Sequence, residues 1–170
     1  SAGRRGLQGR EGRAAILSAL KMGYRGIDTS EMNRNLFDVG WACQASGLKR
    51  QELFLIVKIP PFSHGYEAAK LSLHRQLQQL QTTYADLLLV QWPHVWHPEQ
   101  QQWGLSEWQR VNKWKAGLLQ GTWAALEEMY ESGKAKAIGV SNYTVEHLEE
   151  LLVNCRVPPM VLQAESHPHW

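Results

Sequence analysis

The stretch LFLIVKIP, residues 53–60, decides the fold class of this chain. Its side chains are apolar at nearly every position, which is typical of a strand buried on both faces in a parallel sheet. The stretch ADLLLVQWP, residues 85–93, has the same character and is stopped by Pro93. Between the two, residues 66–81 place leucines along one helical stripe. Together they predict a β–α–β unit with a right-handed crossover.

The same alternation of strand and helix extends in both directions along the chain. It predicts an α/β fold with about five parallel strands, over residues 25–28, 53–59, 85–91, 135–140 and 160–165. In a barrel the carboxyl ends of such strands converge on one mouth, whereas in an open sheet they line a crevice. No G-x-G-x-x-G motif follows the first strand, which disfavours a dinucleotide-binding open sheet. The polar residues at the predicted carboxyl ends are Asp28, Lys58, Gln91, Ser141, Asn142, Gln163 and Glu165.

Two further helices and a glutamine cluster carry expectations about burial. Residues 118–132 should turn Trp123, Leu126 and either Met129 or Tyr130 inward. Thr144 should cap a last helix that buries Val145, Leu148, Leu151 and Leu152. The glutamines near residues 76–81 are expected to lie on a solvated surface.

Composition limits the classes of partner. The chain has 170 residues, 44% of them hydrophobic, and a formal net charge of +2, so we expect one globular domain without nucleic-acid or membrane partners. Two cysteines form no disulfide framework and favour a reducing, cytoplasmic location. The basic, glycine-rich residues 1–13 predict a disordered tail or a docking arm, followed by one domain over residues 14–170.

A long loop, residues 94–117, interrupts the alternation and is rich in tryptophan. Its rings could enclose a substrate, dock a protein partner or pin the loop onto the rim of a barrel. His94 and His97 have a spacing that alone does not define a metal site, because no third ligand is placed by the sequence. We therefore expect no metal centre.

Five motifs in order together resemble the aldo-keto reductases, which are β/α-barrel enzymes that reduce carbonyls with a nicotinamide cofactor, usually NADPH. They are GYRGIDTS (23–30), LFLIVKIP, YADLLLVQWP (84–93), ALEEMYESGKAKAIGVSNY (125–143) and VLQAESHP (161–168). The resemblance covers about residues 14–170 and implies an incomplete (β/α)8 barrel that contains strands 2 to 6. The family's strands 7 and 8, which carry further cofactor-binding groups, would lie outside this chain.

The resemblance also implies roles for individual residues. Asp28 and Lys58 match the family's catalytic aspartate and lysine, whereas the tyrosine position falls on Asn33 and the histidine position on Gln91. Trp92 matches a substrate-binding residue. The residues that match the nicotinamide cradle are Ser141, Asn142 and Gln163.

This pattern predicts impaired chemistry. A hydride delivered to a carbonyl leaves an alkoxide that needs a proton, and a tyrosine whose pKa of about 10 is lowered by a nearby ammonium can supply it. The amide of Asn33 cannot, although Gln91 could still donate a hydrogen bond. Glu31, His94 and His97 are the nearby groups that could substitute, and Asp28 with Lys58 could instead be a purely structural pair.

Three interpretations follow. The leading one is an NADPH-dependent carbonyl reductase domain, impaired or a pseudoenzyme, that takes a small carbonyl substrate if active. The second is a non-catalytic binding or regulatory module that engages a protein through residues 94–117. The third is an unstable fragment of a longer reductase.

Overall fold

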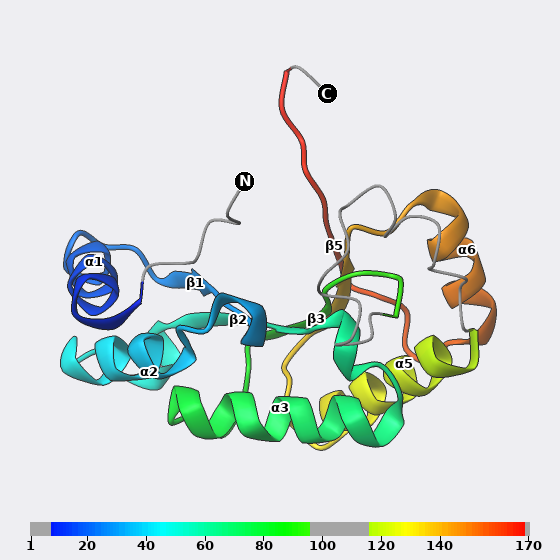
Figure 1. The fold of residues 1–170 in the computed structure, drawn as a ribbon, viewed down its shortest axis with the longest axis horizontal. Helices are drawn as coiled ribbons and strands as arrows, with labels where there is room; N and C mark the ends of the chain where they lie inside the picture. Colours follow the sequence, from blue (N-terminus) through cyan, green and yellow to red (C-terminus); the bar gives the residue numbers. More distant parts are fainter. Residues whose placement is uncertain (1–7, 96–115, 169–170) are drawn as a thin grey trace.

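The computed structural model describes residues 8–95 and 116–168 of the chain. Strands and α-helices alternate along it, with short 3₁₀ turns near the strand ends (Figure 1). The strands are β1 (Gly26–Asp28), β2 (Phe54–Ile59), β3 (Leu87–Val90), β4 (Ile138–Ser141) and β5 (Val161–Gln163). The helices are α1 (Gly9–Lys21), α2 (Leu36–Ala45), α3 (Tyr66–Leu80), α5 (Ala116–Glu131) and α6 (Val145–Asn154), and the 3₁₀ turns are η1 (Glu31–Asn33), η2 (Arg50–Glu52) and η3 (Pro61–Ser63).

The five strands form one parallel sheet in the order β1-β2-β3-β4-β5. The helices follow one another in an arc along the outer side of this sheet, which curls inside the arc (Figure 1). This arrangement confirms the predicted half of a β/α barrel. Within the described residues, β1 and β5 are the two edge strands.

The hydrophobic core lies between the sheet and the helices. In β2 the alternate residues Leu55, Val57 and Ile59 are at most 1% exposed, whereas Phe54 on the other face is 45% exposed. Helix α5 contributes Trp123, Leu126 and Met129 to the core, and all three are buried. The outer face of the sheet is therefore covered by the chain's own helices, and the inner face is only partly covered.

The first helix extends into the predicted tail. α1 begins at Gly9, so residues 9–13 of that tail are helical, as the helical pattern of residues 10–23 (REGRAAILSALKMG) also indicates. The carboxylate of Asp38 in α2 explains the earlier start, because it accepts hydrogen bonds from the Gly9 amide at 2.7 Å and from Arg13 Nε at 2.7 Å. Residues 1–7 of the predicted tail lie outside the described residues.

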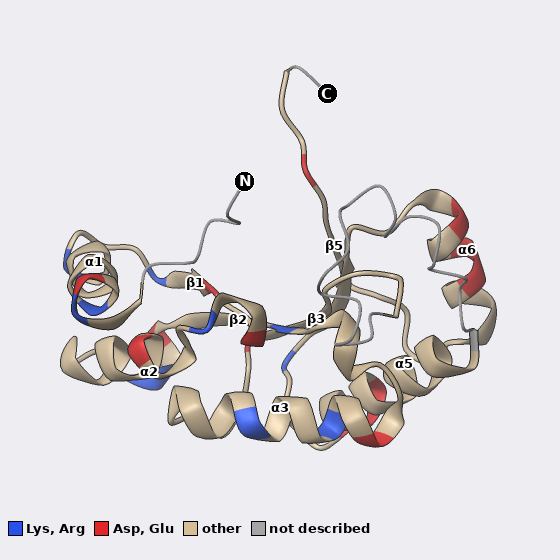
Figure 2. Ribbon diagram, in the orientation of Figure 1, with Lys and Arg blue, Asp and Glu red and all other residues tan. Residues whose placement is uncertain are grey.

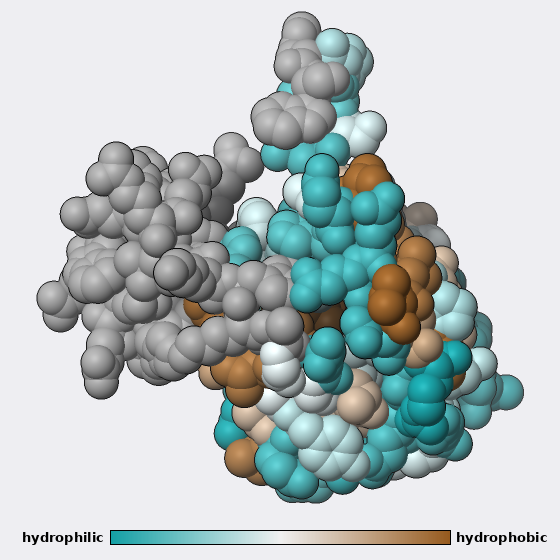
Figure 3. Space-filling model, turned by 90° about the vertical axis from the view of Figure 1, so that its right-hand side faces the viewer, coloured by the Kyte–Doolittle hydropathy of each residue, from teal (hydrophilic) through white to brown (hydrophobic). Residues whose placement is uncertain are grey.

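Two burial predictions were wrong. Val145 and Leu152 of α6 are 67% and 52% exposed, because only Leu148 and Leu151 of the predicted apolar face pack against the core. Figure 3, which views the molecule from this side, shows apolar side chains among hydrophilic ones. Gln76 was expected on the surface but is 0% exposed, because it lies on the face of α3 that packs against the sheet.

Charged residues of both signs are spread over the helices (Figure 2). The most buried ion-pair cluster lies where β3 begins, at the end of the sheet opposite the strands' carboxyl ends. There Asp86 lies 2.7 Å from Arg50 and 3.1 Å from Lys136. Burial opposes ionisation of Asp86, but hydrogen bonds from the Leu55 amide, Arg50 and Lys136 outweigh it and hold its pKa below the ordinary value.

None of the helices in the described part combines the length and apolarity that crossing a membrane requires. Residues 96–115, most of the tryptophan-rich loop at residues 94–117, lie outside the described residues. The predicted protein partner of that loop therefore stays a prediction. The role of His97 as a substitute acid also stays a prediction.

Candidate functional site

The carboxyl ends of β1 and β2 bring together the predicted aspartate and lysine. The parallel register pairs Asp28 with Ile56, so Lys58 follows two residues later on the same face of the sheet. Lys58 Nζ lies 3.0 Å from Asp28 Oδ2, and the two side chains are 15% and 37% exposed. An ammonium this close to a carboxylate and this far from solvent is held in one place, as an electrostatic catalytic group must be.

A second cluster of polar groups forms where β4 and β5 end. The register pairs Ser141 with Gln163, and the Ser141 hydroxyl lies 3.4 Å from Gln163 Oε1. Asn142 adopts a left-handed backbone conformation with φ of 62°. Its amide Nδ2 donates to Ser141 Oγ at 3.1 Å and to the Gln91 carbonyl at 3.0 Å. A non-glycine residue in this region is strained, and such strain is concentrated at functional sites.

The two clusters meet across the mouth of the half barrel. Gln163 Nε2 donates to Asp28 Oδ2 at 2.8 Å, the same oxygen that faces Lys58. This contact joins the first strand of the sheet to the last through side chains, although their backbones are not paired. Six of the predicted site residues are thus connected: Lys58, Asp28, Gln163, Ser141, Asn142 and, through its backbone carbonyl, Gln91.

Gln91, at the predicted histidine position, lies between these clusters at the end of β3. Its backbone amide donates to the Ile59 carbonyl at 3.0 Å, which fixes its place in the sheet. Its side-chain oxygen is buried and has no hydrogen-bond partner among the described residues. A buried amide oxygen without a partner is costly, and a ligand hydrogen-bond donor at this position would relieve that cost.

Asn33 is the last residue of η1, which begins three residues after Asp28. Its backbone N–H donates to the Ser30 carbonyl at 3.0 Å, and its own carbonyl accepts from Gln8 Nε2 at 3.0 Å. Within the described part, Asp28 is the residue that contacts the Lys58 ammonium, and no tyrosine or histidine touches it. Among residues 8–95 and 116–168, the structure therefore places no alternative acid at Lys58.

Two of the alternative acids named from the sequence, Glu31 and His94, are engaged elsewhere. Glu31 accepts a hydrogen bond from Ser72 Oγ at 2.8 Å and lies 3.3 Å from Arg75 Nη2. The His94 ring packs against Trp92, with ring centroids 5.3 Å apart. Burial, with the charges of His64 and His147 adding to it, lowers the pKa of His94 to about 4. A histidine with so low a pKa is neutral near pH 7 and is a poor proton donor.

The sequence analysis missed His64, which supports the predicted substrate residue Trp92. The His64 ring is buried, and its Nε2 lies 3.1 Å from the Trp92 carbonyl. Its Nδ1 lies 3.1 Å from Thr122 Oγ1 in α5. Burial lowers the pKa of His64 to about 4, so the ring is neutral near pH 7. A histidine after two prolines carries no sequence signal of such a role.

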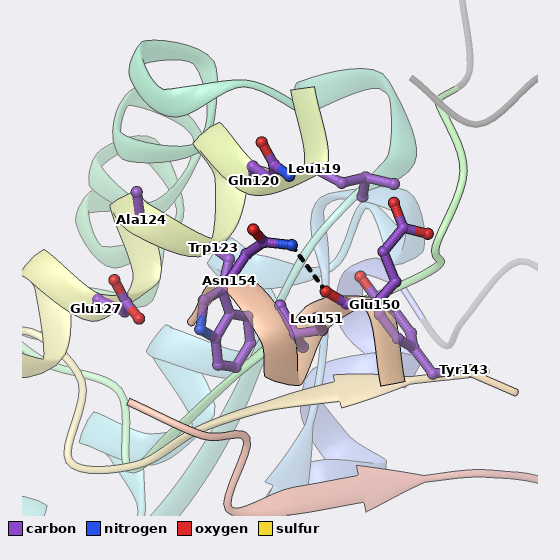
Figure 4. A pocket seen from close by; sticks show the side chains of 9 residues that line it. All are labelled: Leu119, Gln120, Trp123, Ala124, Glu127, Tyr143, Glu150, Leu151 and Asn154. Atoms are coloured by element: carbon purple, nitrogen blue, oxygen red, sulfur yellow. Dashed lines mark hydrogen bonds between the residues drawn. The ribbon is translucent and has the colours of Figure 1, made fainter. Parts of the chain in front are cut away.

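A small cavity lies away from the strand ends, between α5 and α6 (Figure 4). Trp123, Tyr143 and Leu151 provide much of its apolar wall, and its volume is about 50 Å³. That space suffices for a few water molecules but not for a nicotinamide ring or a carbonyl compound with its neighbours. The strand ends, rather than this cavity, are therefore the candidate site.

Comparisons with known proteins concern the family and the fold of this chain. The Aldo/keto reductase family profile matches residues 3–169. Glyoxal reductase of Bacillus subtilis is 39% identical over 160 residues, which are 94% of this chain and 50% of that protein. The solved aldo/keto reductase of Brucella melitensis is 35% identical with a TM-score of 0.78, over 92% of this chain and 54% of its own.

A solved aldo-keto reductase in complex with NADPH is 29% identical, with a TM-score of 0.79. The match covers 96% of this chain and 49% of that one. The chain thus spans about half the length of the curated relatives it matches. Because the family profile extends over nearly all of its residues, this chain belongs to the aldo/keto reductase family.

Proposed function

We propose that this chain is part of an NADPH-dependent carbonyl reductase whose turnover is limited by the lack of a proton donor. The reaction would convert an aldehyde or ketone to an alcohol. The observation that carries the proposal is the ion pair of Lys58 and Asp28, 3.0 Å apart at the carboxyl ends of adjacent strands. Catalytic groups of β/α barrels lie at that end of the strands.

The residues present suit a nicotinamide carboxamide. That group has one carbonyl oxygen and one NH₂, and Ser141, Asn142 and Gln163 offer both donors and acceptors from two adjacent strand ends. When bound, NADPH supplies the hydride. Gln163 now donates to Asp28, so holding the carboxamide would require it to exchange that hydrogen bond.

The chain's own residues would orient the carbonyl better than they would protonate it. The Lys58 ammonium can stabilise a developing alkoxide, and Gln91 can donate a hydrogen bond if its amide turns. Asn33, at the tyrosine position, has an amide that does not release a proton near neutral pH. Loss of a general acid typically costs about 10²–10⁴-fold in rate.

Small aldehydes are the first substrate class to test. The similarity to a glyoxal reductase motivates this choice, since that relative is 39% identical over nearly all of this chain. Trp92, which follows β3 and is supported by His64, would provide the apolar contact to the substrate. A cytoplasmic location remains a prediction, to which the two free cysteines, Cys43 and Cys155, conform.

The proposal is tested by NADPH fluorescence titration and by loss of NADPH absorbance with glyoxal. We expect measurable cofactor binding and a slow turnover that Lys58→Met abolishes. Lys134→Met, which removes an exposed lysine before β4, at the end of the sheet opposite the mouth, is the matched control and should change neither quantity. A turnover typical of enzymes, about 1 per second or faster, would contradict the impaired site, and absence of NADPH binding would favour the non-catalytic module.

A further inference from the structure

We propose that Gln76 and Ser72 of α3 are positioning residues of the mouth, which fix η1 relative to the end of β2. The inference rests on the proposed function, because it concerns where the proton-donor position at Asn33 lies relative to Lys58. It assigns a task to two side chains that neither the family resemblance nor the ion pair involves.

Gln76 is the first link. It is 0% exposed, on a helix whose other buried side chains include Leu73 and Leu77. Its Nε2 donates to the Lys58 backbone carbonyl at 3.0 Å and to Ser72 Oγ at 3.1 Å. A carbonyl oxygen only accepts, so the Lys58 carbonyl fixes which end of the amide faces β2.

Ser72 is the second link and is also 0% exposed. Its hydroxyl accepts from Gln76 and donates to Glu31 Oε2 at 2.8 Å. The Glu31 side chain is 18% exposed, and its other oxygen lies 3.3 Å from Arg75 Nη2. The hydrogen bonds thus run from the Lys58 backbone through α3 to the first residue of η1.

The chemistry of the links argues for a purpose beyond packing. A buried amide or hydroxyl is costly unless it is paired, and an apolar residue would fill the same space without that cost. Gln76 even leaves its Oε1 buried with no hydrogen-bond partner in the described part of the chain. We infer that these hydrogen bonds instead fix the position of η1, the turn that ends at Asn33.

The connection matters because, among the described residues, the other side-chain contacts of η1 are more exposed: Arg75, which pairs with Glu31, is 44% exposed. The contact of Gln8 with the Asn33 carbonyl is exposed, and the turn ends at Arg34 in a left-handed conformation with φ of 54°. The Ser72–Glu31 bond joins η1 to the packed side of the sheet. Without it, the side chain at position 33 would sample several distances from the Lys58 ammonium.

The test installs a reporter phenol with Asn33→Tyr and titrates it by difference absorbance against the parent chain. With Gln76 and Ser72 intact, the pKa of the phenol should fall at least about one unit below its ordinary value of about 10, because the ammonium favours the phenolate. Adding Lys58→Met should abolish that shift. Adding Ser72→Ala or Gln76→Leu should return the pKa most of the way to 10.

Ser63→Ala is the matched control, because Ser63 is also buried, at 4% exposure, but lies outside the chain of hydrogen bonds. It should cost stability without moving the phenol pKa. If Ser72→Ala leaves the phenol pKa as low as in Asn33→Tyr alone, the positioning role is wrong.

Amide hydrogen exchange in the otherwise unmodified chain provides a separate readout. Ser72→Ala should accelerate exchange of the Asn33 and Arg34 amides, which bond within η1, by about tenfold, whereas Ser63→Ala should not. If the phenol pKa is never lowered but exchange accelerates, the donor position of the proposed function fails and the positioning of η1 stands. Unchanged exchange overturns the inference.

Discussion

Strands β3 and β5 have similar apolar sequences but very different surroundings. The four residues of β3 are at most 5% exposed, whereas Val161 and Leu162 of β5 are 38% and 47% exposed. β3 has a paired strand on each side, while β5 is paired only with β4 among the described residues. The same side-chain chemistry is therefore core in one strand and surface in the other.

This difference divides the candidate site. Lys58 and Gln91 belong to the well-packed centre of the sheet, whereas Gln163 belongs to the exposed strand. Burial of apolar area is the main source of stability, so the centre should be more stable than the β5 edge. The structure around Lys58 should accordingly persist under conditions that unfold β5 and release Gln163 locally.

The largest effect is expected from a pair of identical truncations. Leu88→Ala removes a side chain that is 0% exposed and should lower the free energy of unfolding by about 2–5 kcal/mol. Leu162→Ala, at 47% exposure, should cost less than about 1 kcal/mol. Urea unfolding of both variants measures the contrast. Equal losses would show that β5 is as well packed as β3.

The buried histidines should make the folded chain less stable in acid. The pKa of His64 is about 4 in the folded chain, below its ordinary value of about 6.5, so folding favours the neutral ring. Stability is then fully present above pH 6.5 and falls as the pH drops toward 4, by up to about 3 kcal/mol. His94, also shifted to about 4, contributes in the same direction.

His64→Asn should flatten that pH dependence in urea unfolding measured at several pH values. His167→Asn is the control, because that side chain lies beyond β5 and is 42% exposed. An unchanged slope in His64→Asn would mean that folding does not lower the pKa of this histidine.

The packing of the edge strand β5 against the centre of the sheet can be tested at Gly139 of β4. A Cβ there would lie 2.4 Å from the Val161 carbonyl oxygen and 2.9 Å from Leu89 Cδ2. Gly139→Ala should therefore displace β5 and cost about 1–3 kcal/mol. Gly26→Ala in β1 meets nothing within 4 Å and is the control. Amide exchange of Gln163 and Asn142 should rise in the first variant alone.

The smallest stability effect is expected at the ion pair itself. Asp28 is 37% exposed, so solvent screens its attraction to Lys58. Lys58→Met should change the free energy of unfolding by no more than about 1 kcal/mol, as measured by urea unfolding. A much larger loss would favour the structural interpretation of this pair over the functional one.

Strand periodicity was sufficient to predict the sheet, and its limits show where the sequence alone fails. Continuous apolar runs located β2, β3 and β4 well, because both faces of those strands are at least partly covered. Helical periodicity predicted a buried apolar face for α6, but Val145 on that face is 67% exposed. The period of a helix does not tell how much of its apolar face has a neighbouring element.

For the candidate site, the polar residues at the strand ends were named from the sequence because parallel strands share one edge. The structure added contacts between elements distant in sequence: Gln163 with Asp28, Gln76 with Lys58, and His64 with Trp92. No periodic pattern encodes such contacts, since each depends on where two separate elements cross. Gln76 illustrates the point, since a glutamine in a polar run predicts surface while the fold buries it.

The central claim is that Lys58 and Asp28 remain in place while the proton donor does not. Its most direct test is the rate of NADPH-dependent glyoxal reduction by the Asn33→Tyr, Gln91→His double variant relative to the parent chain. The account predicts a gain of at least about 100-fold, the usual contribution of a general acid, and loss of that gain when Lys58→Met is added. A double variant that binds NADPH as the parent does but reduces glyoxal no faster would contradict the claim.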